Sequence, residues 1–362
     1  MRKDQSKLTL EPGVVEQTSG TPEKSSELIE MLSSIWRRAL NRPSIDLEDD
    51  FFDLGGDPWS AITVFSEISR ILGPEVSPLL IYHTRTIRSL AAALQERSLP
   101  HIPAVTLLRP GETGLPPIFL VHGCGATIME FFELTKHMRS RHPIYGMQAR
   151  GTDGREEPFD RAEDLSEYHL AAIKRIQRRG PYLLVGYSYG GLVALEIARQ
   201  LSAIREEIGL LVMMDSFPPL NQLSVSQLIK LKASRATHDV ADYVKNFGNR
   251  LLNRKEQSTQ RRLIPTPLTR AMRQFQARDY STLQQYRARF YNGTVRFVSP
   301  KNAWLLPTDP TAVWGPMTKE FHLDTVPGDH YEMVTTYSQS VAAVLSRYLK
   351  DVDGPDCVIR KP

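Results

Sequence analysis

Apolar runs of strand length recur along the C-terminal two thirds of the chain and alternate with stretches of helical spacing. A buried strand is expected for each short apolar run bounded by turn residues, and a helix where apolar positions return every three or four residues. This alternation predicts an α/β sheet with buried strands. The predicted strands cover 118–121, 182–185, 209–214 and 295–298, and predicted helices lie at 192–199 and 338–349.

The N-terminal third shows helical spacing only. Predicted helices cover 26–40, 59–72 and 86–94, with an acidic loop at 45–57 between the first two. This pattern predicts a small helical bundle over 26–98, ahead of the α/β domain at 117–350. Residues 1–25 are polar and are expected to be disordered, 99–116 are expected to form a linker, and 351–362 a tail.

One turn in the α/β part carries a recognisable nucleophile pattern. The strand at 182–185 runs into a Gly-x-Ser-x-Gly turn at 186–190, with Ser188 at its centre, and the helix follows at once. This order is the nucleophile elbow of the α/β-hydrolases, where glycines flank the serine because the backbones pack too closely for a Cβ. The alternative is a glycine turn that carries a surface serine.

Partners for the serine must follow in the order acid, then histidine. Asp215 ends the apolar run at 209–214, which places it at the carboxyl edge of a parallel sheet. His330 lies in a Gly-Asp loop ahead of the last predicted helix. His330 would take the Ser188 proton, Asp215 would hold the imidazole tautomer, and Ser188 would form an acyl-enzyme.

Two other acids near the last strands compete with Asp215 for the orienting role. Asp309 follows the strand at 295–298 and is the rival acid. Asp329 is adjacent to His330 in the chain, so a role in bracing the loop suits it better. The site prediction therefore retains Asp215, with Asp309 as the alternative.

An acyl transfer also needs two backbone N–H groups for the developing oxyanion. The first is expected from Tyr189, directly after the nucleophile. The second is expected from the turn after the strand at 118–121, with Cys124 preferred over Gly125. Cys124 could instead be a thiol nucleophile, but it lacks the elbow that surrounds Ser188.

Five ordered blocks extend the pattern beyond the elbow: 117–123 (Pro-Ile-Phe-Leu-Val-His-Gly), 144–151, 180–191, 215–216 and 327–330. With them the sequence resembles the type I thioesterase domains that close nonribosomal peptide and polyketide assembly lines. The family's nucleophile, acid and base map onto Ser188, Asp215 and His330, and the family carries its acid on the earlier strand. The resemblance implies release, by hydrolysis or intramolecular cyclisation, of an acyl or peptidyl chain held as a thioester on a phosphopantetheinyl carrier in secondary metabolism, such as antibiotic biosynthesis.

The helical bundle resembles a peptidyl or acyl carrier domain, whose loop reads Asp-x-Phe-Phe-x-Leu-Gly-Gly-x-Ser. Residues 49–57 match this loop, but Pro58 holds the place of the serine that receives phosphopantetheine. Proline offers no hydroxyl, and Ser60 lies further into the predicted helix and points elsewhere. We therefore expect no bound cofactor here, and a carrier protein or synthetase module that supplies phosphopantetheine-bound substrate in trans.

Charge is unevenly distributed although the net charge is only +4. Residues 26–98 contain 7 Lys/Arg and 11 Asp/Glu, whereas 221–290 contain 14 Lys/Arg and 4 Asp/Glu. The thioesterase resemblance implies a helical lid at about 217–290. Its basic excess could be a solvated surface or could attract an acidic carrier; nucleic-acid binding is not expected without a recognised motif.

Composition narrows the setting. Cys124 and Cys357 show no metal-ligand spacing, so no metal is expected, and a reduced cytoplasm is the simplest compartment. No leader pattern and no run near the ~20 apolar residues of a membrane helix is found, so no membrane partner is expected. Two other function classes stay open, a non-catalytic docking protein and a general carboxylesterase.

Overall fold

The structure is a computed structural model and describes residues 22–73, 76–95, 101–125, 127–153, 155–216, 223–226, 229, 270–302 and 309–353. Most of the predicted disordered segment, most of the predicted lid and most of the predicted tail lie outside these residues. None of the helices in this part of the chain is long and apolar enough to cross a membrane.

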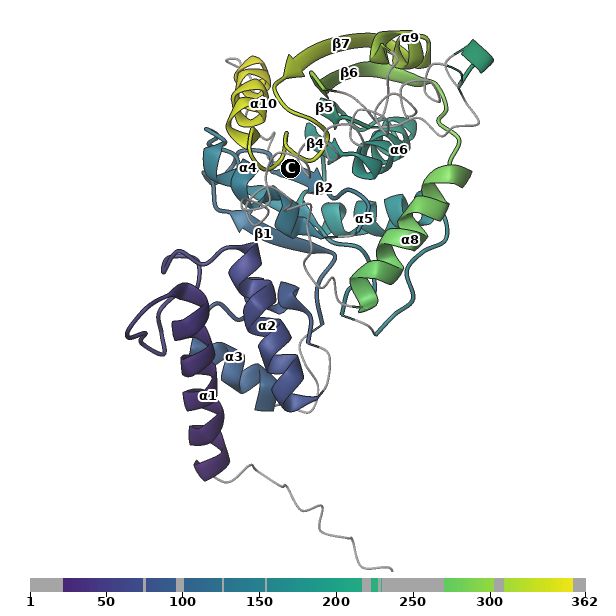
Figure 1. Ribbon diagram of the computed structural model, residues 1–362. Coiled ribbons are helices and arrows are strands. Elements are labelled where there is room, and N and C mark those ends of the chain that lie inside the picture. The colour runs from purple at the N-terminus through teal and green to yellow at the C-terminus, as the bar shows by residue number, and fades with distance from the viewer. Residues whose placement is uncertain are drawn as a thin grey trace, which may run out of the picture.

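A seven-stranded sheet forms the centre of the larger domain (Figure 1). The strand order is β1-β3-β2-β4-β5-β6-β7, and all neighbours pair in parallel except β1 with β3. The α/β prediction is thus confirmed. The strands are β1 (Val105–Arg109), β2 (Ile118–Val121), β3 (Ile144–Met147), β4 (Tyr182–Tyr187), β5 (Ile208–Met214), β6 (Tyr291–Pro300) and β7 (Thr318–Val326).

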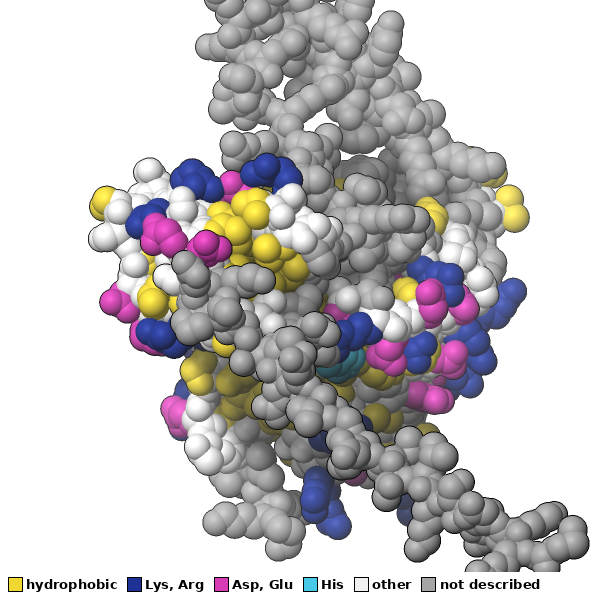
Figure 2. Space-filling model, turned by 90° about the horizontal axis from the view of Figure 1, so that it is seen from below, with side chains coloured by type: hydrophobic (Ala, Val, Ile, Leu, Met, Phe, Trp, Pro, Cys, Tyr) yellow, Lys and Arg dark blue, Asp and Glu magenta, His cyan; other side chains and the backbone are white. Residues whose placement is uncertain are grey.

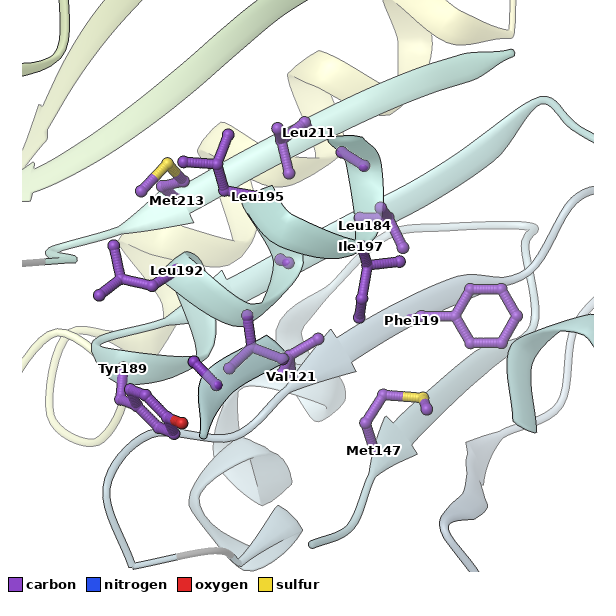
Figure 3. Packing of buried hydrophobic residues seen from close by; sticks show 14 of the residues in the cluster. Phe119, Val121, Met147, Leu184, Tyr189, Leu192, Leu195, Ile197, Leu211 and Met213 are labelled. Atoms are coloured by element: carbon purple, nitrogen blue, oxygen red, sulfur yellow. The ribbon is translucent and has the colours of Figure 1, made fainter. Parts of the chain in front are cut away.

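Helices cover both faces of this sheet. As a result β2, β4 and most of β5 are buried on both sides. On one face α5 (Ala162–Ile176) and α6 (Tyr189–Ala203) enclose a core that includes Val121, Leu192 and Met213 (Figure 3). The C-terminal part of α8 (Arg270–Gln285) adds to this core. On the other face α4 (Phe132–His137) and α10 (Ser338–Val352) pack over a second core.

The helical bundle forms as the spacing of apolar residues predicts. It consists of α1 (Pro22–Leu40), α2 (Pro58–Leu72), the 3-10 helix η1 (Pro78–Tyr82) and α3 (Ile87–Gln95). Trp36 and Phe51 are fully buried at its centre, and their rings meet edge to face with centroids 4.9 Å apart. Such aromatic pairs stabilise a small core beyond the area they bury.

The core of the bundle continues into the α/β domain. Ile128 and Met129, in the short 3-10 helix η2 (Ile128–Phe131), pack within the apolar cluster of the bundle. Phe52 of the bundle also lies against Phe132 of α4, with ring centroids 5.6 Å apart. Because apolar side chains from both domains share one cluster, water is excluded between them.

Three strands, β1, β3 and β7, are not among those predicted from the sequence. β1 lies inside the range predicted as a linker, and it pairs only with β3 at the edge of the sheet. Only Thr106 of this strand is fully buried, so it has no apolar alternation to reveal it. The other edge strand, β7, is mostly exposed and polar for the same reason.

Surface charge is mixed on the face that Figure 2 presents. Among the described residues there, Lys and Arg side chains lie beside Asp and Glu, with hydrophobic side chains between them. The basic excess of 221–290 belongs mostly to residues that the structure does not describe.

Candidate active site

The turn between β4 and α6 has the backbone geometry of a nucleophile elbow. Ser188 has φ 54° and ψ −121°, a region that non-glycine residues rarely adopt. Its N–H donates to the Met214 carbonyl at 2.8 Å, and its own carbonyl accepts from Gly191 N–H at 3.1 Å. Ser188 thus begins α6 in a fixed, strained conformation, with its side chain at the positive end of the helix dipole.

Glycines are required on both sides of the serine. A Cβ on Gly186 would collide with the carbonyl oxygen of Gly190. A Cβ on Gly190 would in turn collide with the carbonyl of Val121, at the end of the neighbouring strand β2. The Gly-x-Ser-x-Gly pattern is therefore a packing requirement where β2, β4 and α6 meet.

Asp215 and His330 lie at hydrogen-bond distance from each other although 115 residues separate them. Nδ1 of His330 is 2.7 Å from Oδ2 of Asp215, and both side chains are buried. A carboxylate can only accept here, so Nδ1 carries the proton and Nε2 is left as the basic nitrogen. Asp215 follows β5 and His330 follows β7, so both come from the sheet edge at which Ser188 follows β4.

Tyr187 fixes the position of His330 from the strand that carries the serine. Its ring stacks on the His330 imidazole with centroids 4.9 Å apart, and its hydroxyl donates to the His330 carbonyl at 2.6 Å. Burial, with lesser contributions from Glu130 and Asp215, raises the pKa of the Tyr187 hydroxyl, so it stays a donor. Sequence reasoning missed this contact, and the only signal was the place of Tyr187 inside the elbow.

The two competing acids have other partners. Asp309 is exposed and caps the short helix α9 (Pro310–Trp314), accepting from Thr311 N–H at 2.9 Å. Asp329 accepts from Tyr331 and Glu332 N–H, both at 2.9 Å, and so braces the turn that contains His330. Neither carboxyl forms a hydrogen bond with the His330 imidazole, so the structure favours Asp215 as its partner. The catalytic roles of Ser188, Asp215 and His330 stay predictions.

The turn after β2 presents three consecutive backbone N–H groups beside the elbow. Gly123 N–H donates to Glu130 Oε1 at 2.6 Å, and Gly125 N–H donates to Asp279 Oδ2 at 3.0 Å. Within the described residues, no acceptor is found for the Cys124 N–H between them. This occupancy favours Cys124 over Gly125 as the oxyanion donor that accompanies Tyr189.

The Cys124 thiol is poorly suited to be the nucleophile. Burial raises its pKa well above the usual range, and the nearby carboxyl groups of Asp279 and Glu130 raise it further. A thiol of this kind is protonated at neutral pH, whereas the thiolate is the reactive form. This weakens the thiol alternative.

The start of α2 does not fit an attached phosphopantetheine. Pro58 is the first helical residue, and Asp57 caps the helix by accepting from Ser60 N–H at 2.7 Å. The Ser60 hydroxyl accepts from Asp57 N–H at 2.8 Å and lies 2.7 Å from the Asp57 carboxylate. The hydroxyl nearest to position 58 thus belongs to a capping box, which satisfies both partners.

Comparison with known families decides the assignment. Residues 116–351, more than half of the chain, match the family described as thioesterase domain. The chain belongs to the thioesterase domain family. Residues 30–94 match the family described as phosphopantetheine attachment site, so the predicted pairing of a carrier-like domain with a thioesterase is confirmed. This second family implies attachment within this same chain, a role for which Pro58 lacks the hydroxyl.

Relatives of this thioesterase-family chain are large synthetases. It is 36% identical over 191 residues to a dimodular nonribosomal peptide synthase of Bacillus subtilis, covering 52% of the chain and 8% of that protein. It is 29% identical over 257 residues to atromentin synthetase invA1 of Paxillus involutus, covering 66% of the chain and 26% of that protein. The chain therefore spans only a small part of these curated relatives.

Solved structures share the fold of this thioesterase-family chain. The four-domain nonribosomal peptide synthetase holo-AB3403 superposes with a TM-score of 0.55 at 20% identity, covering 93% of the chain and 27% of that structure. The type II thioesterase BorB of the borrelidin biosynthetic cluster gives 0.52 at 17% identity, covering 69% and 99%. At these identities the likeness concerns the fold.

Proposed function

We propose that this chain is a serine thioesterase that releases an acyl or peptidyl chain from a phosphopantetheinyl carrier by way of a Ser188 acyl-enzyme. The observation that carries the proposal is the 2.7 Å hydrogen bond between Asp215 and His330, at the sheet edge where Ser188 sits in a strained elbow. Family membership supplies the substrate class, an acyl thioester.

Acylation follows from the groups at this edge. His330 Nε2 takes the Ser188 proton as Oγ attacks the thioester carbonyl, and Asp215 stabilises the imidazolium that forms. The N–H groups of Tyr189 and Cys124 bind the negative oxygen of the tetrahedral intermediate. The C–S bond then breaks, and His330 returns the proton to the departing thiolate.

Deacylation uses the same groups in reverse order. His330 deprotonates water or a hydroxyl or amine of the acyl chain itself, and that nucleophile attacks the Ser188 ester. Collapse of the second intermediate releases the acid or the cyclic product, and Ser188 regains its proton. Which nucleophile wins depends on how far water is excluded.

We further propose that the helical domain stays unloaded and that a carrier on another chain delivers the substrate. Pro58 has no hydroxyl, and the Ser60 hydroxyl is engaged by Asp57. A domain that is folded but unmodified can hold the thioesterase near its partners and raise the effective concentration there.

Labelling with a fluorophosphonate tests the nucleophile. The wild type should gain the mass of the probe, and Ser188→Ala should gain none, whereas the matched control Ser202→Ala, exposed on the same helix α6, should label normally. The same proteins are then given carrier-bound acyl thioesters and simple esters, with products read by mass spectrometry. Labelling of Ser188→Ala, or faster turnover of simple esters than of carrier thioesters, would contradict the proposal.

A further inference from the structure

Two carboxyl groups brace the turn that carries the proposed second oxyanion donor. Glu130, from η2, accepts the N–H of Gly123, and Asp279, from α8, accepts the N–H of Gly125. Asp279 is 6% exposed, and its bond spans 154 residues of sequence. The Cys124 N–H lies between these two fixed points.

A third contact holds the peptide unit to which the Cys124 N–H belongs. His122 Nδ1 lies 2.7 Å from the Gly123 carbonyl oxygen. Burial lowers the pKa of His122 to about 4, so the ring is neutral and its single proton sits on Nδ1 to meet that carbonyl. Because a trans peptide is planar, fixing the Gly123 C=O also fixes the opposite direction of the Cys124 N–H.

We propose that Glu130 and Asp279 are positioning residues that aim the Cys124 N–H at the oxyanion. The proposal rests on the proposed function. It also connects the turn after β2 to α8 through the hydrogen bond from Gly125 to Asp279. Since Asp279 is part of α8, a displacement of that helix moves Gly125 and misaligns the donor beside it. The catalytic turn and the helix that ends the predicted lid region are thereby coupled through one hydrogen bond.

The protonation of these groups is compatible with an oxyanion nearby. Two full negative charges beside the turn would oppose the charge that develops on the substrate. Burial raises the pKa of Glu130 to about 8 and that of Asp279 to about 7, against the lowering effect of the N–H groups they accept from. A neutral carboxyl still accepts through its carbonyl oxygen.

The contact with Gly125 can be separated from the general anchoring of α8. Arg278, the preceding residue of the helix, pairs with Asp160 at 2.6 Å. Leu283, at the end of α8, and Tyr286, just beyond it, are buried in the core that α5 and α6 enclose. Asp160→Asn therefore removes a charge-pair contact from the same part of the helix without touching the turn, which makes it the matched control for Asp279.

The test compares Asp279→Ala, which removes the acceptor, with Asp279→Asn, which keeps an amide oxygen at that place. We expect kcat with a carrier thioester to fall about 10- to 100-fold in Asp279→Ala, somewhat less than the 10²–10³ known for outright loss of a donor. Its KM should stay within about twofold, because an oxyanion contact forms only in the transition state. Asp279→Asn and Asp160→Asn should stay near the wild type.

Affinity for a boronic acid that forms a tetrahedral adduct on Ser188 provides a second readout. It should weaken in parallel with kcat in Asp279→Ala, while affinity for an unreactive substrate analogue stays unchanged. If Asp279→Ala does not fold, Glu130→Met against Glu130→Gln repeats the comparison at Gly123.

Unchanged kcat in a folded Asp279→Ala or Glu130→Met overturns the proposal, as does an equal loss in Asp160→Asn. These outcomes leave the Ser188 mechanism standing. A wild type with no Ser188-dependent turnover instead refutes the proposed function and the positioning role together.

Discussion

The strain at this site is confined to single residues and is held by neighbouring strands. Ser188 and Asp215 both have positive φ, at 54° and 42°. The N–H of Ser188 donates to the end of β5, and the N–H of Asp215 donates to Val298 of β6 at 2.9 Å. Each strained residue is thus fixed by the backbone of the next strand, so its side chain needs no large rearrangement to react.

Replacing Asp215 with Asn should leave the fold intact and lower kcat by about 10⁴, because an amide favours the wrong imidazole tautomer. Steady-state kinetics with a carrier thioester and a thermal melt measure the two effects. The matched control is Asp309→Asn, the same change at an exposed helix cap, which should retain full activity. If the two variants exchanged these results, the orienting acid would be Asp309.

Glu130 should make the free energy of unfolding depend on pH. Its pKa is about 8 in the folded protein against the ordinary 4.5, because of burial first, and Asp279 raises it further. The groups facing it are Asp279 of α8, Tyr187 of β4 and Cys124 of the turn. The folded state holds a proton that the unfolded state has lost, so stability should fall as pH rises from about 5 to 8.

Urea unfolding of the wild type and Glu130→Gln at pH 5 and pH 8 measures this dependence. The variant has no carboxyl to titrate there, so its stability should fall less between the two pH values. Parallel pH profiles for the two proteins would show that Glu130 ionises normally in the folded state.

At the scale of elements, the sequence could predict what is encoded locally. The elbow between β4 and α6 is marked by glycines whose spacing a packing constraint imposes, and the run at 209–214 is apolar because β5 is covered on both faces. Three strands were missed. The edge strands β1 and β7 are each paired on one side only and carry few buried residues, whereas β3 is buried but contributes only four residues. The chain order of Asp215 and His330 after the elbow predicted the pair that the structure brings to hydrogen-bond distance, whereas the catalytic roles of Ser188, Asp215 and His330 stay predictions.

The supporting contacts of the site could not be predicted in this way. Asp279 meets Gly125 only because α8 packs beside the turn after β2, and nothing near either residue in sequence indicates it. Glu130 lies seven residues from Gly123, but a charged residue in a short apolar helix is an ambiguous pattern. Such contacts arise from tertiary packing and have no periodicity.

Gly186→Ala should disrupt the junction of β4 and α6, because its Cβ would meet backbone that cannot move aside. We expect a loss of at least about 3 kcal/mol, at the upper end for overpacking. Gly315→Ala is the control, since its nearest contact would be ordinary, at 3.9 Å. Urea unfolding of both proteins checks this, and equal stability would show that the elbow has room for a side chain.

At the scale of the molecule, a domain that has the residues of its candidate site is joined to a domain that lacks the hydroxyl of its attachment site. The hydrolase domain has the strained serine and the paired acid and histidine, whereas the helical domain has kept its core but not its attachment serine. Trp36 and Phe51 form a closed, buried cluster in a domain that has Pro58 at the attachment position, so we expect the proline to remove the hydroxyl without unfolding the domain.

Incubation with a phosphopantetheinyl transferase and coenzyme A should therefore add no mass to the wild type. Pro58→Ser should gain the mass of the arm if the transferase accepts the loop, since the capping box beside it is independent of residue 58. Ser60→Ala is the control for modification at the neighbouring hydroxyl. A mass increase on any residue of the wild-type helical domain would refute the unloaded state.

The apolar cluster shared by the helical domain and the hydrolase domain limits how freely the helical domain can move between catalytic centres. A carrier domain that visits several catalytic domains has to dissociate from each of them quickly, so its contacts with them must be small and hydrated. Here departure would return Phe52, Ile128 and Met129 to water at about 25 cal/mol per Å² of apolar surface. We therefore expect the helical domain to stay docked on the hydrolase domain, where a phosphopantetheine arm could not visit other catalytic domains.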